Sequence, residues 1–333
     1  MLNPNAKLKE NVFEKPDQAA TRDGFGKGIL ELGEKDPRVV VLCADLAESV
    51  RVLPFKEKYP DRFVELGVAE QNLATVGSGL ANYGKIPFIS SYATFSPGRN
   101  NEQIRTTIAL NNVPVKIAGA HAGVSVGPDG ATHQALEDIA LMRVLPHMTV
   151  IYPCDNEEAY KATLASVAVD GPVYLRLARE KTPVITTAGT PFAVGKANVL
   201  WDPGEIQVAI IATGPLVHNA LLAAEELRAE VPVAVINLHT IKPLDAETVV
   251  AYASKAGAVV TVEEHQVMGG MGSAVAEVLA ARTPVPIEFV GVHDQFGQSG
   301  EPAELLEHYG MGVSHIVAAV RKACLRRQVQ SRK

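Results

Sequence analysis

The feature that most constrains the fold is a series of apolar, strand-length runs that alternate with helix-length segments. Examples are RVVVLCAD (38–45), IPFISSYATF (86–95) and VPVKIAGAH (113–121). These runs are nearly continuous in hydrophobicity, whereas a strand with one solvated face alternates apolar and polar residues. Continuous runs are typical of parallel strands that are buried on both faces. The chain therefore predicts an α/β fold of the doubly wound kind.

The same alternation continues along the chain. In the first half, strands are also predicted at 62–67, 148–154 and 172–178, and helices around 23–35, 70–83, 98–111, 133–145 and 156–168. The stretch 179–205 holds several prolines and glycines and is interpreted as a linker followed by a strand. Beyond it, strands are predicted at 206–214, 231–245, 258–265 and 287–294, and helices around 216–229, 245–256, 272–282 and 313–325. We predict two doubly wound domains with mostly parallel sheets, 1–187 and 188–333.

Composition excludes several classes of function. The net charge of −6, without a basic stripe, argues against a nucleic-acid surface. No apolar run approaches the roughly 18 residues of a membrane span, and the polar N-terminus lacks the apolar stretch of an export signal. The three cysteines (Cys43, Cys154 and Cys324) form no metal-binding or disulfide pattern. We expect a cytoplasmic protein with no metal ligands of its own.

Reactive side chains gather after successive predicted strands of the first half. In open parallel sheets, ligands bind at the carboxyl ends of the strands. The side chains at these ends are Asp45, Ser49, Glu70, Tyr92, Phe95, His121 and Arg179. Taken singly, each has a structural interpretation, such as a helix N-cap for Ser49 or a first-turn carboxylate for Glu70. Their concentration at one edge predicts a binding site.

Two glycine-rich segments are weaker candidates for ligand sites. GFGKG (24–28) lies inside a helix-like segment, whereas a nucleotide-binding loop connects a strand to a helix. MGGMGSA (268–274) fits a helix that packs closely on a strand, or a cradle for an anion. We favour the packing interpretation for the second segment.

Five segments, in their order along the chain, resemble transketolase: ADLAES, LGVAEQN, SYATF, AHAGVSVGPDGATHQALED and LRLARE. The resemblance runs from about Thr21 to Cys324 and matches the pyrimidine-binding and C-terminal domains of that family. The combination of DGATHQ (129–134) with the AEQ turn (69–71) is specific to the thiamine-diphosphate-dependent transketolase group. The resemblance implies transfer of a two-carbon ketol unit between sugar phosphates by ylid chemistry, as in the pentose phosphate pathway.

The resemblance also implies roles for the cofactor-binding residues. Glu70 takes the position of the carboxylate that bonds the aminopyrimidine ring and promotes ylid formation. Such a bond is strong in an apolar pocket. Phe95 is expected to stack on the aminopyrimidine, with Tyr92 nearby, and Asp45 to lie in the cofactor loop.

For the substrate, the resemblance implies that His133 acts in catalysis and that both His133 and Asp129 contact the sugar hydroxyls and the reacting centre. Buried charged groups can discriminate between sugars, because a wrong sugar leaves them unpaired. The expected holders of the terminal phosphate are Arg22, Ser49, His121 and Arg179. Guanidinium, imidazole and hydroxyl groups suit a phosphate dianion.

The first domain of a complete transketolase has no counterpart in this sequence. That domain holds the diphosphate through Mg²⁺ and carries a GDG motif, which is absent here. We therefore expect the C-terminal subunit of a split transketolase. Its partner would be an N-terminal subunit that supplies the Mg²⁺–diphosphate site, in an α2β2 assembly.

The sequence is also compatible with other functions. Half of a deoxyxylulose-phosphate synthase shares the AEQ and DGxTHQ elements, but His121 and ALED (135–138) favour transketolase. The β subunit of a 2-oxo-acid dehydrogenase has a similar plan and typically lacks DGxTHQ. A non-catalytic protein would not need the retained acidic, histidine and arginine residues. A nicotinamide oxidoreductase would need a glycine fingerprint that the sequence does not have.

Overall fold

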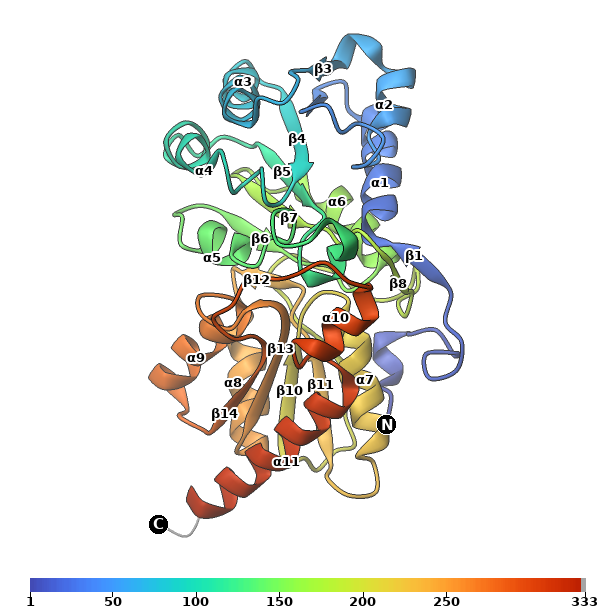
Figure 1. Ribbon diagram of the computed structural model, residues 1–333, viewed down its shortest axis with the longest axis vertical. Coiled ribbons are helices and arrows are strands. Elements are labelled where there is room, and N and C mark those ends of the chain that lie inside the picture. The colour runs from blue at the N-terminus through green and yellow to red at the C-terminus, as the bar shows by residue number, and fades with distance from the viewer. Residues whose placement is uncertain (331–333) are drawn as a thin grey trace.

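The computed structural model describes residues 1–330 and contains two open α/β sheets, one above the other in Figure 1. In the described residues, the larger sheet has seven strands. Their order is β12 (Thr240–Lys242), β6 (Thr149–Ile151), β7 (Val173–Arg176), β5 (Lys116–Ala120), β4 (Ile86–Tyr92), β2 (Val39–Cys43) and β3 (Phe63–Glu65). All pairings are parallel except that of β12 with β6.

The smaller sheet has five strands in the part of the chain that is described. Their order is β14 (Ile287–Val292), β13 (Val259–Gln266), β10 (Val208–Ala212), β11 (Val233–Asn237) and β9 (Asn198–Trp201). Only the β9–β11 pairing within this sheet is antiparallel. A short antiparallel pair, β1 (Gln18–Ala20) with β8 (Lys181–Pro183), lies outside both sheets. Two α/β units with mostly parallel sheets are thus confirmed.

Helices connect the strands of both sheets (Figure 1). In the first half they are α1 (Thr21–Lys35), α2 (Leu53–Lys58), α3 (Glu70–Asn82), α4 (Asn101–Gln103), α5 (Asp138–Arg143) and α6 (Asn156–Ser166). In the second half they are α7 (Leu216–Glu226), α8 (Ala246–Ala256), α9 (Met271–Arg282), α10 (Pro302–His308) and α11 (Val313–Gln330). Short 3-10 helices are η1 (Pro4–Ala6), η2 (Pro60–Arg62) and η4 (Val124–Asp129), and η3 (Ile104–Ala109) is a π-helix.

Burial explains why the continuous apolar runs become central strands. Every residue of β2, β5 and β10 is buried, because helices cover both faces of each sheet. Helix termini are fixed locally. For example, Asp155 caps α6 by accepting a hydrogen bond from the Glu158 N–H at 2.9 Å, and Gly257, whose φ is +75°, caps the C-terminus of α8.

Three predicted elements differ from the structure. The helix predicted at 98–111 is α4 followed by η3, and the helix predicted at 133–145 begins only at Asp138. The run 231–245 forms two strands, β11 and β12, which belong to different sheets. Elements α2, α10, β1 and β8 were not predicted, because segments of three to seven residues carry too little periodicity.

The two halves of the chain are packed together. Val150 and Ile241 lie in one apolar cluster, and Ala6 and Val12 are buried with residues of the smaller sheet. The Phe13 ring meets the Trp201 ring edge-on, with their centroids 5.9 Å apart. The domain limits 1–187 and 188–333 stay a prediction.

Candidate active site

The carboxyl edge of the larger sheet carries most of the predicted site residues. The chain leaves β2 for the edge strand β3, and then returns through α3 to β4 on the other side of β2. Such a reversal of strand order opens a crevice at the carboxyl ends of the strands. Glu70 begins α3, Tyr92 ends β4, and His121 follows β5. The sequence prediction of one shared edge is confirmed for these three residues.

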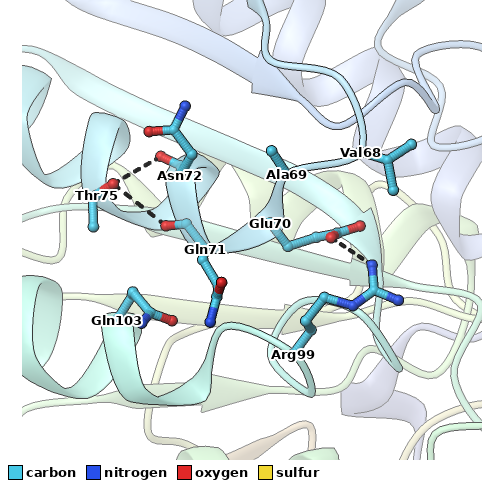
Figure 2. A pocket seen from close by; sticks show the side chains of 8 residues that line it. All are labelled: Val68, Ala69, Glu70, Gln71, Asn72, Thr75, Arg99 and Gln103. Atoms are coloured by element: carbon cyan, nitrogen blue, oxygen red, sulfur yellow. Dashed lines mark hydrogen bonds and ion pairs between the residues drawn. The ribbon is translucent and has the colours of Figure 1, made fainter.

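Glu70 lies beside a cavity of 470 Å³ (Figure 2). The cavity is lined by Val68, Ala69, Glu70, Gln71, Asn72, Thr75, Arg99 and Gln103. The Glu70 side chain is only 1% exposed, and its Oε2 lies 2.7 Å from Nη1 of Arg99. A buried carboxylate requires such compensation, because desolvation disfavours the charged form.

The loop after β4 is tied to the first turn of α3. The buried side chain of Asn100 donates Nδ2–H bonds to the Glu70 carbonyl at 2.9 Å and to Ser96 Oγ at 3.1 Å. The Arg99 guanidinium lies over the Phe95 ring, 4.6 Å from its centroid. Arg99 therefore connects the Glu70 cavity to the aromatic residues at the end of β4.

Four rings form a cluster next to this loop. The Tyr92 ring stacks on His121 at a centroid separation of 3.8 Å, and on Phe95 at 5.9 Å. His133 meets the edge of both aromatic rings, at 6.1 Å from Tyr92 and 5.3 Å from Phe95. The cluster thus joins two aromatic rings to two imidazoles at this edge of the sheet.

Arginines give the same edge a positive charge. Nη1 of Arg22 lies 3.3 Å from Nε2 of His121 and donates to the Ser49 carbonyl at 2.8 Å. Nη1 of Arg179 donates to the Val126 carbonyl at 2.6 Å. Burial, and then the charges of Arg22 and Arg179, lower the pKa of His121 to about 3. His121 is therefore neutral at physiological pH.

The neighbouring guanidinium decides the tautomer of His121. Arginine can only donate, so Nε2 of His121 accepts the bond and Nδ1 carries the proton. Within residues 1–330, neither this Nδ1 nor Nε of Arg22 has a hydrogen-bond partner, and both are buried. Unsatisfied buried donors next to an open edge are chemically suited to oxygen atoms of a bound anion.

Backbone strain coincides with the site. His121 has a φ of +55° and Asp45 a φ of +60°, values that residues other than glycine rarely adopt. Such conformations persist where the surroundings enforce them, and they cluster at functional sites. For Asp45, the enforcing contact is the Glu65 carboxylate, which accepts its N–H at 2.7 Å.

The remaining predicted site residues make fewer contacts with the ring cluster and the arginines. Ser49 contributes its backbone carbonyl, through the bond from Arg22. Asp129 is exposed at the end of η4, and in the described part of the chain no hydrogen bond or ring contact joins Asp129 or Asp45 to the ring cluster. His133 has its Nδ1 2.9 Å from Thr132 Oγ1. The structure thus brings Arg22, Tyr92, Phe95, His121 and His133 together.

Arg99 was missed by the sequence analysis. The signal that could have found it is the burial predicted for Glu70, since a buried carboxylate needs a cation nearby. An arginine in the loop after the neighbouring strand is a natural source of that cation. The sequence alone did not show that this side chain turns back toward α3.

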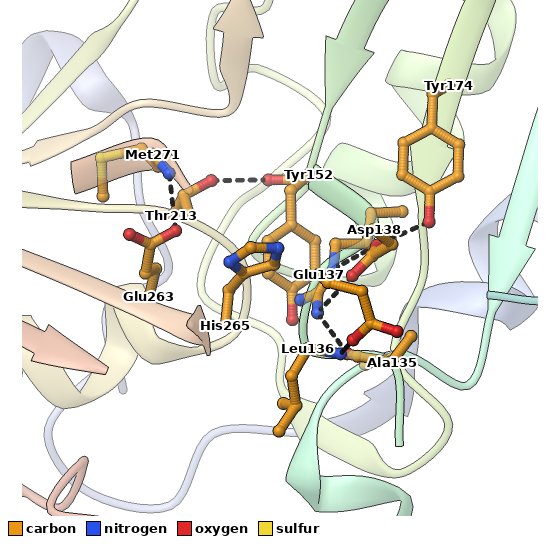
Figure 3. A network of polar contacts seen from close by, with 12 residues as sticks. Ala135, Leu136, Glu137, Asp138, Tyr152, Tyr174, Thr213, Glu263, His265 and Met271 are labelled. Carbon is orange, nitrogen blue, oxygen red and sulfur yellow. Dashed lines mark hydrogen bonds and ion pairs between the residues drawn. The ribbon is translucent and has the colours of Figure 1, made fainter. Parts of the chain in front are cut away.

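The MGGMGSA segment has a structural role, as predicted. Glu263 accepts the N–H groups of Met271 at 2.6 Å and Gly272 at 2.8 Å, so the chain's own carboxylate occupies the N-terminus of α9 (Figure 3). Burial raises the pKa of Glu263 to about 7. A Cβ atom on Gly272 would lie 2.6 Å from Thr261 Oγ1, which shows how closely the helix packs on β13.

Comparison with known families gives two consecutive matches. Residues 17–184 match the model of the transketolase pyrimidine-binding domain, and residues 195–316 match that of the transketolase C-terminal domain. The chain is 41% identical over 307 residues to the 6-deoxy-6-sulfo-D-fructose transketolase subunit of Clostridium sp. (strain MSTE9), covering 92% of this chain and 95% of the relative.

Two further similarities agree with these matches. A putative transketolase C-terminal section of Methanocaldococcus jannaschii is 42% identical over 294 residues, covering 87% of this chain and 92% of the relative. A solved structure described as a split-gene transketolase, inactive beta4 tetramer, superposes with a TM-score of 0.86. It is 45% identical and covers 92% of this chain and 99% of that chain. Among the described residues, no helix is long and apolar enough to cross a membrane.

Proposed function

Because the chain belongs to the transketolase family, we propose that it is the C-terminal subunit of a two-subunit transketolase. The proposed reaction transfers a two-carbon ketol unit from a ketose phosphate to an aldose phosphate. The relatives that match this chain over most of both lengths include a transketolase subunit and a protein described as a putative transketolase C-terminal section.

The observation that carries the proposal is the Glu70 site. A carboxylate that is 1% exposed lines a 470 Å³ cavity, and Arg99 of the same lining lies over the Phe95 ring. This combination fits an aminopyrimidine, which needs an aromatic face and a carboxylate to share a proton with its ring nitrogen. When bound, thiamine diphosphate supplies a carbon nucleophile and accepts the electron pair of the broken C–C bond.

Each residue of this chain has a defined task in the proposed reaction. Glu70 holds a proton between its carboxylate and the cofactor ring, and the burial of the carboxylate strengthens that bond. Phe95 and Tyr92 provide the flat surface that orients the ring. Asp45 is proposed to support the cofactor loop after β2.

Six other residues of the same edge are proposed to bind the substrate. Arg22, Arg179 and the Nδ1–H of His121 bind the terminal anion of the sugar, and Ser49 supports Arg22. His133, whose Nε2 is the ring nitrogen not engaged by Thr132, exchanges protons with the reacting hydroxyl groups, and Asp129 binds a neighbouring hydroxyl.

A partner subunit completes the proposed enzyme. We propose that an N-terminal subunit holds the diphosphate through Mg²⁺, in an α2β2 assembly located in the cytoplasm. The related split-gene transketolase was solved as an inactive beta4 tetramer, which supports the expectation that this chain alone is inactive. Val68, which lines the cavity and is 71% exposed, leaves apolar surface there for such a partner.

The terminal anion of the sugar could be a phosphate or a sulfonate, and the residues that bind it discriminate between the two. One relative acts on a 6-deoxy-6-sulfo sugar, and a sulfonate is also bound by arginine. We propose a phosphate, because two guanidiniums and a neutral imidazole donor suit a dianion better than a single negative charge.

The test is ketol transfer from xylulose 5-phosphate to ribose 5-phosphate with thiamine diphosphate and Mg²⁺. The chain is assayed alone, with the N-terminal subunit, and with that subunit after Glu70→Gln. Activity only in the mixture with unaltered Glu70 supports the proposal. Inactivity with sugar phosphates, together with consumption of pyruvate and glyceraldehyde 3-phosphate, assigns the chain to a synthase instead.

A further inference from the structure

One segment of the larger-sheet unit lies directly on the smaller-sheet unit. Residues 121–134 connect β5 to the region before α5 and carry His121, Asp129 and His133. Three of its glycines have positive φ: Gly123 at +91°, Gly127 at +80° and Gly130 at +73°. A segment so rich in glycine is costly to order, so contacts from outside must hold it in place.

The first outside contact comes from Glu264, on β13 of the smaller sheet. Its Oε1 accepts the Ser125 N–H at 2.6 Å across 139 residues of sequence, and Glu264 is 1% exposed. A Cβ atom at Gly123 would lie 2.2 Å from the same oxygen, so the carboxylate rests directly on the backbone. Desolvation raises the pKa of Glu264.

The second outside contact comes from the loop after β14. Nε2 of the buried Gln134 donates to the carbonyls of Val124 at 3.0 Å, Gly127 at 3.3 Å and Gln298 at 2.9 Å. The first two acceptors fold the segment onto itself, and the third joins it to the loop. A Cβ atom at Gly297 would lie 1.8 Å from Oε1 of Gln134, so the fit depends on a glycine there.

The end of the segment is fixed from within the larger sheet. Arg176, fully buried, donates Nη2 to the Ala135 carbonyl at 3.1 Å and Nε to Asp138 at 2.8 Å. The Tyr174 hydroxyl donates to Asp138 at 2.6 Å. Figure 3 shows the Tyr174 hydroxyl directed at Asp138, in a network of polar contacts that also includes His265 of β13. These bonds fix Ala135 and Asp138, so the part of the segment before them depends on the contacts from the smaller-sheet unit.

We infer that the C-terminal domain contributes to catalysis by positioning an active-site segment. Glu264 and the backbone of Gln298 hold the segment that carries His133 and Asp129. Glu264 is a positioning residue, which acts through the Ser125 N–H and touches no substrate. Catalysis depends on such supporting contacts, since small displacements of a reacting group cost large factors in rate. This inference rests on the proposed function.

The test compares Glu264→Ala with Glu264→Gln in the complete two-subunit enzyme. Glutamine keeps an oxygen that can accept the Ser125 N–H, whereas alanine leaves that N–H unsatisfied. Removing a buried carboxylate also removes its desolvation cost, so the alanine variant should fold. We expect kcat/KM to fall by about tenfold or more for Glu264→Ala, mainly through kcat, and much less for Glu264→Gln.

Hydrogen exchange gives a readout that does not need turnover. The Ser125 amide and residues 124–133 should exchange faster in Glu264→Ala than in Glu264→Gln or the unaltered chain. Gly297→Ala, in a surface loop, should produce the same loss by displacing Gln134, which keeps the inference testable if Glu264→Ala does not fold. Gln295→Ala, at an exposed position of the same loop, is the control and should leave exchange and turnover unchanged.

Two results would overturn the inference. One is faster exchange of residues 124–133 without loss of kcat/KM, and the other is equal loss in both Glu264 variants with a parallel drop in thermal stability. An inactive mixture of the unaltered subunits contradicts the proposed function instead. In that case the exchange experiment still decides whether Glu264 holds the segment.

Discussion

Arg99 and Glu70 form an ion pair between the loop after β4 and the first turn of α3, with Nη1 and Oε2 2.7 Å apart. The two partners differ in environment, since the Glu70 side chain is 1% exposed and that of Arg99 is 48% exposed. The guanidinium therefore stabilises a buried charge from the wall of the cavity. It also engages the carboxylate that we assign to the cofactor ring, so Arg99 and the cofactor compete for one group.

Glu70→Gln should abolish turnover without unfolding the chain. Glutamine has the same shape, but it cannot hold a proton between itself and the cofactor ring. Arg99 loses its partner at a half-exposed position, where water can replace the carboxylate, so stability should change little. Steady-state assays of the two-subunit enzyme and thermal melting of this chain check both statements. Near-normal turnover would remove Glu70 from the mechanism.

Arg99→Met should lower the stability of the chain and strengthen its binding of thiamine diphosphate. It leaves a buried carboxylate without its cation, and we expect the free energy of unfolding to fall by roughly 1–2 kcal/mol at neutral pH. Affinity for thiamine diphosphate should rise, since the competitor for Glu70 is gone. Calorimetric titration of the two-subunit enzyme measures that affinity, with Arg105→Met as a control on the exposed side of η3. Weaker binding would show that Arg99 supports the cofactor.

The sequence predicted those site residues whose positions follow from the arrangement of parallel strands. Glu70, Tyr92 and His121 each follow a buried apolar run, and parallel strands bring such positions to one edge. The positions of whole elements could be predicted for the same reason, because burial on both faces gives a continuous pattern.

The part that the sequence missed depends on contacts between distant segments. Arg99 turns toward Glu70 because Asn100 ties its loop to α3, and no local pattern shows that bond. The pairing of β12 with β6 joins the two halves of the chain, although Thr240 and Ile151 lie in separate predicted domains. Periodicity describes one segment at a time, so it contains no information about such pairs.

Arg179→Ala should raise KM for sugars that carry a terminal phosphate by about tenfold or more, with little change in kcat. The reason is that a phosphate remote from the reacting carbon is bound equally in the ground and transition states. The unphosphorylated sugar xylulose is the control donor, and its kcat/KM should not change. A loss with xylulose as well would mean that Arg179 acts through its bond to the Val126 carbonyl.

His121→Asn should make stability less sensitive to acid. The unfolded chain protonates this histidine near pH 6.5, whereas burial and the charges of nearby arginines lower its pKa to about 3 in the folded state. Between these values the unfolded state binds the extra proton, so falling pH favours unfolding. Asparagine tolerates the positive φ and does not titrate. Urea unfolding at pH 7 and pH 5 should show about 2 kcal/mol less loss for the variant; an equal loss would contradict this.

Asp138→Asn should be strongly destabilising. Asp138 is 1% exposed and accepts bonds from Tyr174 and from Nε and Nη2 of Arg176, whose side chain is fully buried. Removing the negative charge leaves the guanidinium without its counter-ion, which costs about 3 kcal/mol or more. Chemical denaturation measures the loss. Glu247→Gln is the matched control, because it breaks the exposed pair with Arg282 and should leave the unfolding midpoint near that of the unaltered chain. Similar midpoints for the two variants would mean that the buried pair does not stabilise the junction of the sheets.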